Sequence, residues 1–138
     1  MKKIVYDCDL TLGVPGCDVD DGLALMYLLG CPEAELLGVT ATYGNNKIDV
    51  VWETMNRMLS ELGQTELPAR KGGAARGEFQ SDAAEFLVDM ANQYAGELSI
   101  LATGSLTNLG GAYTLDPHFF EKVKEIVLMG GITEPLVF

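Results

Sequence analysis

Positive charge is scarce in this sequence. Nine lysines and arginines stand against 20 aspartates and glutamates, which gives a formal net charge of −11 and an isoelectric point near 4.3. Nucleic-acid binding requires a stripe or patch of basic side chains that meets the phosphate backbone. We therefore expect no nucleic-acid partner.

Long apolar runs are absent as well. No stretch reaches the roughly 20 apolar residues that a helix needs to cross a bilayer. The start, Met-Lys-Lys, leads into a strand-like segment rather than the apolar core of a signal peptide. We expect no membrane partner and a cytoplasmic location.

Cysteine and histidine, the usual ligands of zinc, are few. Cys8, Cys17 and Cys31 are an odd number without a Cys-x-x-Cys pair, so we expect reduced thiols rather than a disulfide framework or a zinc site. The one histidine, His118, lies in an Asp-Pro-His-Phe run that predicts a surface helix start, and we assign it no role.

Aspartate, by contrast, is concentrated near the start of the chain. Asp7, Asp9, Asp18, Asp20 and Asp21 fall within fifteen residues, just after an apolar run. Carboxylates at this density repel one another unless a cation lies among them, and an all-oxygen set of ligands suits Ca²⁺ or Mg²⁺. A metal site is the first hypothesis.

Helix capping explains part of this group. Asp18, Asp20 and Asp21 open a predicted helix, where aspartate is a good N-cap and acidic side chains favour the first turn. Asp7 and Asp9 close a predicted strand and cap nothing obvious, so we favour the metal site for the group as a whole.

Strands and helices alternate along the chain. Short apolar runs predict strands at residues 4–6, 34–42, 67–71, 98–102 and 125–129. Apolar spacing predicts helices from 18 or 20 to 30, 47–62, 81–94 with Ser81 as its cap, 103–112, and one or two helical turns within 116–124. We predict one α/β domain over residues 1–138, with three α/β/α layers and a mainly parallel, Rossmann-like open sheet.

Polar or glycine-rich segments follow four of these strands. Ligands of open parallel sheets bind at the carboxyl ends of the strands, above all where the strand order reverses. A 3-2-1-4-5 order would place the reversal between the first and fourth strands. The loop with Asp7 and Asp9 would then face residues 103–105, flanked by residues 44–45 and 130–131.

The chain ends in a mostly apolar segment, residues 132–138, with no closing helix or charged tail. We expect a polypeptide truncated relative to a complete fold, with its final strand left at an unpaired sheet edge. Proteins usually cover such edges. Self-association would do so, and we expect a homo-oligomer.

Residues 4–12 resemble the first motif of haloacid dehalogenase-type phosphatases, an apolar strand followed by Asp-x-Asp-x-Thr-Leu. This resemblance implies Asp7 as the phosphoryl-accepting nucleophile and Asp9 as the general acid/base, with Mg²⁺ bridging. That family also needs a downstream lysine and a late acidic pair, and no convincing Asp-Asp follows residue 100.

Four separated segments instead resemble the nucleoside hydrolases, the inosine-uridine preferring group of N-ribohydrolases. That family opens with a strand, Asp-x-Asp, Gly, and Asp-x-Asp-Asp-Ala-Leu-Ala-Leu. The first matching segment is residues 7–9 with Gly16 and 18–25, and the second is residues 37–40 with 44–45. The third, residues 101–109, resembles the family's segment Ala-x-Gly-Pro-Leu-Thr-Asn-Leu. The fourth, residues 123–131, resembles the family's strand that ends in Met-Gly-Gly, and all four follow the family's order.

The resemblance implies a hydrolase, a glycosidase of purine and pyrimidine salvage that cleaves a ribonucleoside to free base and ribose with a Ca²⁺-activated water. Asp9 and Asp21 would ligate Ca²⁺ through their carboxylates and Thr103 through its main-chain carbonyl, and Asp9 would deprotonate the water. The chemistry suits these residue types, because carboxylates stabilise an oxocarbenium-like sugar and a divalent cation lowers the pKa of water.

The same resemblance implies the sugar site. Asp20 would accept hydrogen bonds from the ribose hydroxyls, with Asn45 and Met129 beside the sugar. Asp7 and Asp18 would be supporting groups.

The sequence departs from the family in several places. About five extra residues, within 10–15, separate Asp9 from Gly16, and Gly22 and Ser105 replace an alanine and a proline. The family's third ligating aspartate, an adjacent histidine and most base-contacting residues lie in a C-terminal half that this chain lacks. A third hypothesis is therefore a non-catalytic fragment that self-associates and binds metal or ribose weakly.

Overall fold

The computed structural model describes residues 1–134. Residues 135–138, part of the apolar segment on which the expectation about the chain end depends, lie outside the described residues.

Five strands form one parallel sheet in the order β3-β2-β1-β4-β5. The strands are β1 (Lys2–Cys8), β2 (Ala34–Ala41), β3 (Ala69–Lys71), β4 (Leu98–Ala102) and β5 (Glu125–Leu128). Strand β1 pairs in parallel with both β2 and β4. The predicted α/β class is confirmed, the observed order is the 3-2-1-4-5 arrangement considered above, and it reverses between β1 and β4.

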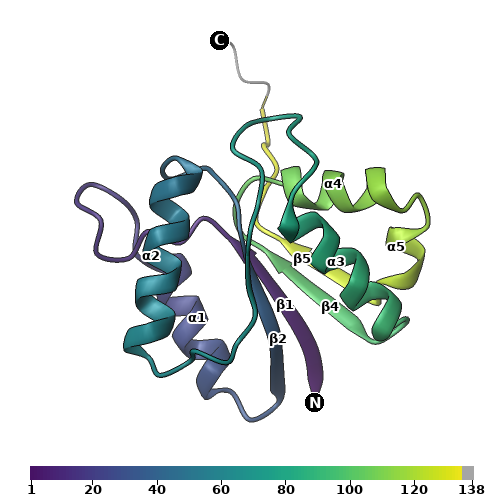
Figure 1. Cartoon of the computed structure of the whole chain (residues 1–138), viewed down its shortest axis with the longest axis horizontal. Helices are drawn as coiled ribbons and strands as arrows, with labels where there is room; N and C mark the ends of the chain where they lie inside the picture. Colours follow the sequence, from purple (N-terminus) through teal and green to yellow (C-terminus); the bar gives the residue numbers. More distant parts are fainter. Residues whose placement is uncertain (135–138) are drawn as a thin grey trace.

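Helices cover both faces of the sheet. They are α1 (Asp20–Gly30), α2 (Ile48–Glu61), α3 (Asp82–Gln93), α4 (Thr107–Leu115) and α5 (Phe119–Lys122). Figure 1 shows α1 and α2 on one face and α3, α4 and α5 on the other, which is the predicted three-layer arrangement.

The middle of β1, residues 4–6, is apolar because both faces of the strand are covered. Tyr6 and Cys8 are buried in the cluster beneath α1 and α2, whereas Val5 is buried with Leu87 and Leu98 in the cluster beneath α3, α4 and α5. The central strand thus fixes where its carboxyl end emerges, between the two helical layers.

Two helix starts agree with the prediction and one differs from it. Ser81 caps α3 as predicted, because its hydroxyl accepts a hydrogen bond from the amide of Ala84 at 3.1 Å. Helix α1 begins at Asp20, one of the two predicted starts, with Asp20 and Asp21 in its first turn; its N-cap is Val19, and no aspartate side chain caps it. Helix α4 begins at Thr107 rather than near residue 103 because the amide of Thr103 still donates to the β1 carbonyl of Asp7 at 3.0 Å.

Strand β5 forms one edge of the sheet, with β4 as its neighbour. On the sheet face that carries α1 and α2, a hollow of about 150 Å³ is lined in part by Ile4, Leu101 and Val127. Val127, which pairs with Leu101 in the β4–β5 register, is 56% exposed. The predicted sheet edge is therefore present among the described residues, and it is apolar.

None of the helices in residues 1–134 combines the length and the apolar character needed to span a bilayer.

Candidate functional site

Two carboxylates meet at the carboxyl end of β1. Asp9 follows the strand, and Asp21 lies in the first turn of α1. The amide of Asp9 donates to Oδ2 of Asp21 at 3.1 Å, and both side chains are buried, with 7% and 4% of their surface exposed. The first strand and the first helix thus bring two acidic groups together in a site of little solvent.

The pairing has an electrostatic cost. Burial, followed by the neighbouring Asp9, raises the pKa of Asp21 above its ordinary value, while the polar side chain of Thr103 nearby acts in the opposite direction. Two buried, neighbouring carboxylates favour either a shared proton or a cation between them. The pair therefore has the chemistry of a cation site.

Glycines allow two loops to approach Asp9. A Cβ atom on Gly44, in the loop after β2, would lie 2.2 Å from Oδ2 of Asp9, and one on Gly104, after β4, would lie 3.2 Å from its Cγ. The amide of Asn45 donates to the same Oδ2 at 2.8 Å. The ends of β1, β2 and β4 therefore converge on one carboxylate, as the strand order predicts.

Asp7 lies two residues before Asp9, within β1, and has a different environment. It is fully buried, and its Oδ2 accepts hydrogen bonds from Oγ1 of Thr40 at 2.5 Å and from Nδ2 of Asn108 at 2.8 Å. Its Oδ1 has no hydrogen-bond partner among the described residues. Burial raises the pKa of Asp7 to about 7, against the effect of the two donors. This carboxyl group ties β1 to β2 and α4 and does not reach solvent.

Thr40 and Asn108 are the partners of Asp7 that sequence reasoning missed. Thr40 pairs with Asp7 in the β1–β2 register, so the register is the signal that could have found it. Asn108 also donates to the carbonyl of Ala41 at 3.0 Å and accepts from the amide of Gly73 at 3.3 Å. A fully buried asparagine with several partners is typical of a structural polar network.

The remaining predicted residues lie around the pair of Asp9 and Asp21 in different ways. Thr103 lies against it: its hydroxyl donates to the Tyr6 hydroxyl at 3.3 Å, and that hydroxyl donates to the carbonyl of Asp21 at 3.1 Å. Met129 follows β5, where its amide donates to the carbonyl of Ala102 at 2.9 Å while its side chain is 62% exposed.

Asp18 and Asp20 are both exposed. Asp20 lies beside Asp21 at the start of α1. Asp18 meets the loop before it through its main chain, since its carbonyl accepts from the hydroxyl of Thr11 at 3.1 Å. His118 is an exposed residue at the start of α5, as expected.

Two departures from the family pattern have local partners. Ser105, which replaces a proline, shares a 2.5 Å hydrogen bond with the hydroxyl of Thr42. Gly22, which replaces an alanine, lies under Leu12: a Cβ on Gly22 would be 2.7 Å from the Cβ of Leu12. Each replacement therefore fits a contact that this chain makes.

The donor set fits a hard cation in part. Within residues 1–134, no group of three or more histidine, cysteine, aspartate or glutamate side chains is placed to hold a metal ion. The side chains supply two adjacent carboxylates, and Ca²⁺ takes six to eight oxygens, including main-chain carbonyls and waters. Asp9, Asp21 and a carbonyl of the adjoining loops would account for one side of such a shell.

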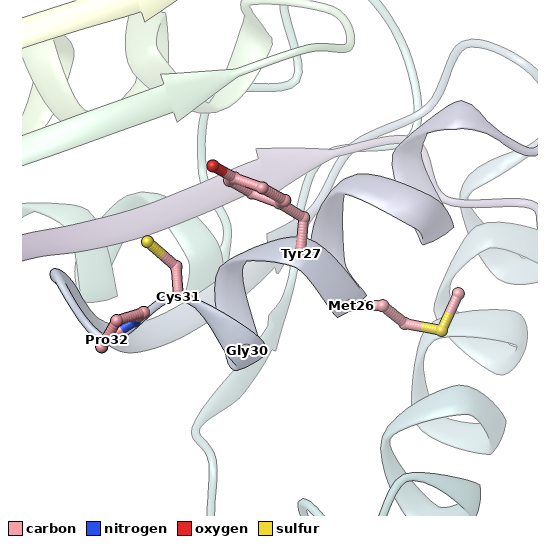
Figure 2. Close-up of a pocket in the computed structure, with 5 residues that line it drawn as sticks. All are labelled: Met26, Tyr27, Gly30, Cys31 and Pro32. Carbon is pink, nitrogen blue, oxygen red and sulfur yellow. The ribbon is translucent and has the colours of Figure 1, made fainter.

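A hollow of about 290 Å³ lies at the other end of α1, lined by Met26, Tyr27, Gly30, Cys31 and Pro32. Figure 2 shows Met26 and Tyr27 leaving the helix in different directions, with no charged side chain among the lining residues. Gly30 lies nine positions after Asp21 in the helix, a rise of roughly 13 Å. This hollow is therefore not part of the acidic site.

Comparison with known proteins identifies the family. The model of the family described as inosine-uridine preferring nucleoside hydrolase matches residues 4–135. The chain belongs to this family. The match includes residues 7–9, which the phosphatase interpretation had claimed, and the complete burial of Asp7 also argues against its use as a nucleophile.

Several members of the family are similar to this chain. It is 30% identical to probable uridine nucleosidase 2 of Arabidopsis thaliana, covering 94% of this chain and 47% of that protein. It is 29% identical to the inosine-uridine preferring nucleoside hydrolase of Crithidia fasciculata, with 94% and 48% covered. This nucleoside hydrolase family member thus spans about half the length of the curated relatives that it matches.

Solved structures of the family share the fold. The plant nucleoside hydrolase PpNRh1 superposes with a TM-score of 0.83 at 27% identity, over 95% of this chain and 48% of that one. The purine-preferring ribonucleoside hydrolase from Gardnerella vaginalis gives 0.80 at 27% identity, over 95% and 49%.

Proposed function

We propose that this chain supplies the cation- and ribose-binding part of a nucleoside N-ribohydrolase, which cleaves the N-glycosidic bond of a ribonucleoside to release the base and ribose. The observation that carries the proposal is the buried pair of Asp9 and Asp21 at the switch point of the sheet, in a chain of the nucleoside hydrolase family. The small-molecule substrate is a ribonucleoside.

We propose Ca²⁺ as the cation. Asp9 and Asp21 would hold it with carboxylate oxygens, and the main-chain carbonyl of Thr103 would add a third. When bound, the ion supplies positive charge that acidifies a coordinated water and balances the two carboxylates. Asp9 then has the position to accept a proton, because it follows the strand directly and is anchored by the amide of Asn45.

The sugar would lie on the exposed side of the pair. Asp20 would accept hydrogen bonds from ribose hydroxyls, and Asn45 and Met129 would lie beside the ring. Binding through several hydroxyls fixes the orientation of the glycosidic bond relative to the carboxylates. Asp7 and Asp18 remain supporting groups in this proposal, Asp7 through its bonds to Thr40 and Asn108.

Titration calorimetry with CaCl₂ tests the proposal. We expect the wild-type chain to bind Ca²⁺ and Asp9→Ala to lose that binding, because a first ligand and one half of the carboxylate pair disappear. Asp89→Ala, an exposed aspartate of α3, is the matched control and should bind as the wild type does. Unchanged affinity in Asp9→Ala would overturn the metal assignment.

Assays of ribose release from inosine and uridine, run beside an assay of phosphate release from a phosphomonoester, test the reaction. Ribose release supports the proposal, and phosphate release would favour the phosphatase. Micromolar Ca²⁺ binding without turnover of either substrate would favour the non-catalytic interpretation. The cytoplasmic location and the homo-oligomeric state stay predictions from the sequence.

A further inference from the structure

The loop between β1 and α1, residues 10–17, is an ordered and anchored segment. The amide of Val14 donates to the carbonyl of Thr11 at 3.0 Å, and the amide of Cys17 donates to the carbonyl of Val14 at 3.1 Å, which makes two successive turns. From α2, the guanidinium of Arg57 donates to the carbonyl of Leu12 at 2.9 Å. These two turns and the contact from Arg57 give the loop a defined structure.

This loop is also packed on α1. The side chain of Leu12 covers Gly22, where a Cβ atom would come within 2.7 Å. Residues 10–17 thus contact both helices of one layer, and the loop can act as a fixed support for what lies next to it.

Its neighbour is Asn45, which the loop holds at two points. The thiol of Cys17 donates to the carbonyl of Asn45 at 3.7 Å, and Nδ2 of Asn45 donates to the hydroxyl of Thr11 at 3.5 Å. The side chain of Asn46 adds a contact, with Nδ2 donating to the sulfur of Cys17 at 3.6 Å. A third point of Asn45, its own amide, is bonded to Oδ2 of Asp9 at 2.8 Å.

The hydroxyl of Thr11 is placed to accept the hydrogen bond from Nδ2 of Asn45. It is fully buried, and its hydroxyl proton is committed to the carbonyl of Asp18 at 3.1 Å, so a lone pair is left to face Asn45. A buried hydroxyl that both donates and accepts a hydrogen bond is held in one orientation. The contact from Thr11 to Asn45 is therefore directional rather than incidental.

We propose that Thr11 and Cys17 are positioning residues, which hold Asn45 so that its amide fixes the rotation of the Asp9 carboxylate. The terminal torsion of an aspartate is broad and roughly two-fold, so a carboxylate needs an external donor to keep one orientation. Outer-shell bonds of this kind orient the groups that ligate a metal. The effect on metal binding rests on the proposed function, in which Asp9 is the ligand and base. The contacts of Thr11 and Cys17 with Asn45 do not depend on it.

Amide hydrogen exchange at Asn45, followed by NMR, reports the positioning without any metal. Thr11→Val keeps the shape of the side chain and removes the hydroxyl, and Cys17→Ala removes the thiol. Each should speed exchange of the Asn45 amide by about three- to tenfold, the effect of losing one hydrogen bond. Thr11→Ser and Cys17→Ser keep a polar group and should restore slow exchange, whereas Cys31→Ala should exchange as the wild type does.

Calcium affinity is the second measurement. Thr11→Val and Cys17→Ala should bind Ca²⁺ roughly 10-fold more weakly, as other outer-shell changes do, with the serine variants near the wild type. Unchanged exchange at Asn45 in both variants, or equal loss in the serine and apolar variants, overturns the positioning role. If the wild type binds no Ca²⁺, the proposed function fails, and the exchange series still decides the positioning role.

Discussion

Asp7 is a carboxyl group without access to solvent, and its two oxygens are unequal. Oδ2 accepts from Thr40 and Asn108, whereas Oδ1 has no partner among the described residues. An ionised carboxylate with a bare oxygen is costly to bury, and burial accordingly raises its pKa to about 7. The position next to the Asp9–Asp21 pair therefore favours a neutral group when no cation is bound.

The pH dependence of stability should show this. The pKa of Asp7 lies near 3.8 in the unfolded chain and about 7 in the fold, so the folded state binds the proton more tightly between these values. The free energy of unfolding should therefore fall as pH rises from about 4 to 7, by up to about 4 kcal/mol, and stay lower above that range. Asp7→Asn, which is neutral throughout, should lose the part of this decrease that Asp7 contributes.

Urea unfolding at several pH values, in the presence of a chelator, measures the difference. Subtracting the Asp7→Asn profile from that of the wild type removes the titration of Asp21 and the surface carboxylates to a first approximation. If the two profiles run parallel between pH 4 and pH 7, Asp7 is not the group with the raised pKa.

At the scale of elements, the loop of residues 10–17 and helix α1 are matched to each other. Glycine within a helix ordinarily costs up to about 1 kcal/mol relative to alanine. Gly22 is nevertheless suited to this chain, because Leu12 occupies the space of its missing side chain. The clash would involve the Cβ of Leu12, which cannot move without the main chain of the loop.

A double-mutant cycle tests this match. Gly22→Ala should destabilise the wild type by about 1–3 kcal/mol through overpacking. In a Leu12→Gly background, which removes that Cβ, the same change should stabilise, by up to about 1 kcal/mol, as helix propensity predicts. Gly30→Ala, in the same helix with open space around the added Cβ, is the control and should not depend on residue 12.

Free energies of unfolding for the four proteins give the coupling between the two sites. A cost for Gly22→Ala that is the same in both backgrounds would show that Leu12 does not set it. If the two sites show no coupling, the packing of Leu12 on Gly22 does not stabilise the loop that contacts Asn45.

At the scale of the whole molecule, the sheet is covered unevenly. Strand β5 is an edge strand, and the apolar side chains at and after it are well exposed, with Val127 at 56% and Met129 at 62%. Parallel sheets are ordinarily covered on both faces, and an exposed apolar edge favours pairing with another chain. The relatives that superpose on this chain extend to about twice its length.

We expect the 138-residue chain to self-associate through this region. Sedimentation velocity over a range of protein concentrations should show a dimer or larger species that dissociates on dilution. Val127→Lys places a charge on the exposed edge and should shift the population to the monomer. Leu115→Lys, at an exposed apolar position of α4, is the control. A monomer at every concentration would contradict this expectation.

The sequence by itself determined the order of elements and where the ligand-binding edge lies. Strand runs and helical periodicities are local signals, so the boundaries of β4, α2 and α3 agree with the structure to within a residue or two. Alternation then imposes a parallel sheet with its polar loops at one edge. The order β3-β2-β1-β4-β5 agrees with the 3-2-1-4-5 arrangement considered from the sequence, but it is the structure that establishes it.

Only the tertiary structure decided which of five similar aspartates are buried and what each one meets. Asp7, Asp9 and Asp21 are buried, whereas Asp18 and Asp20 are exposed, although all five lie within fifteen residues. Burial and pairing depend on partners from distant segments, such as Asn108 for Asp7 and Asn45 for Asp9. These contacts arise from strand register and loop packing, which join residues that no local pattern connects.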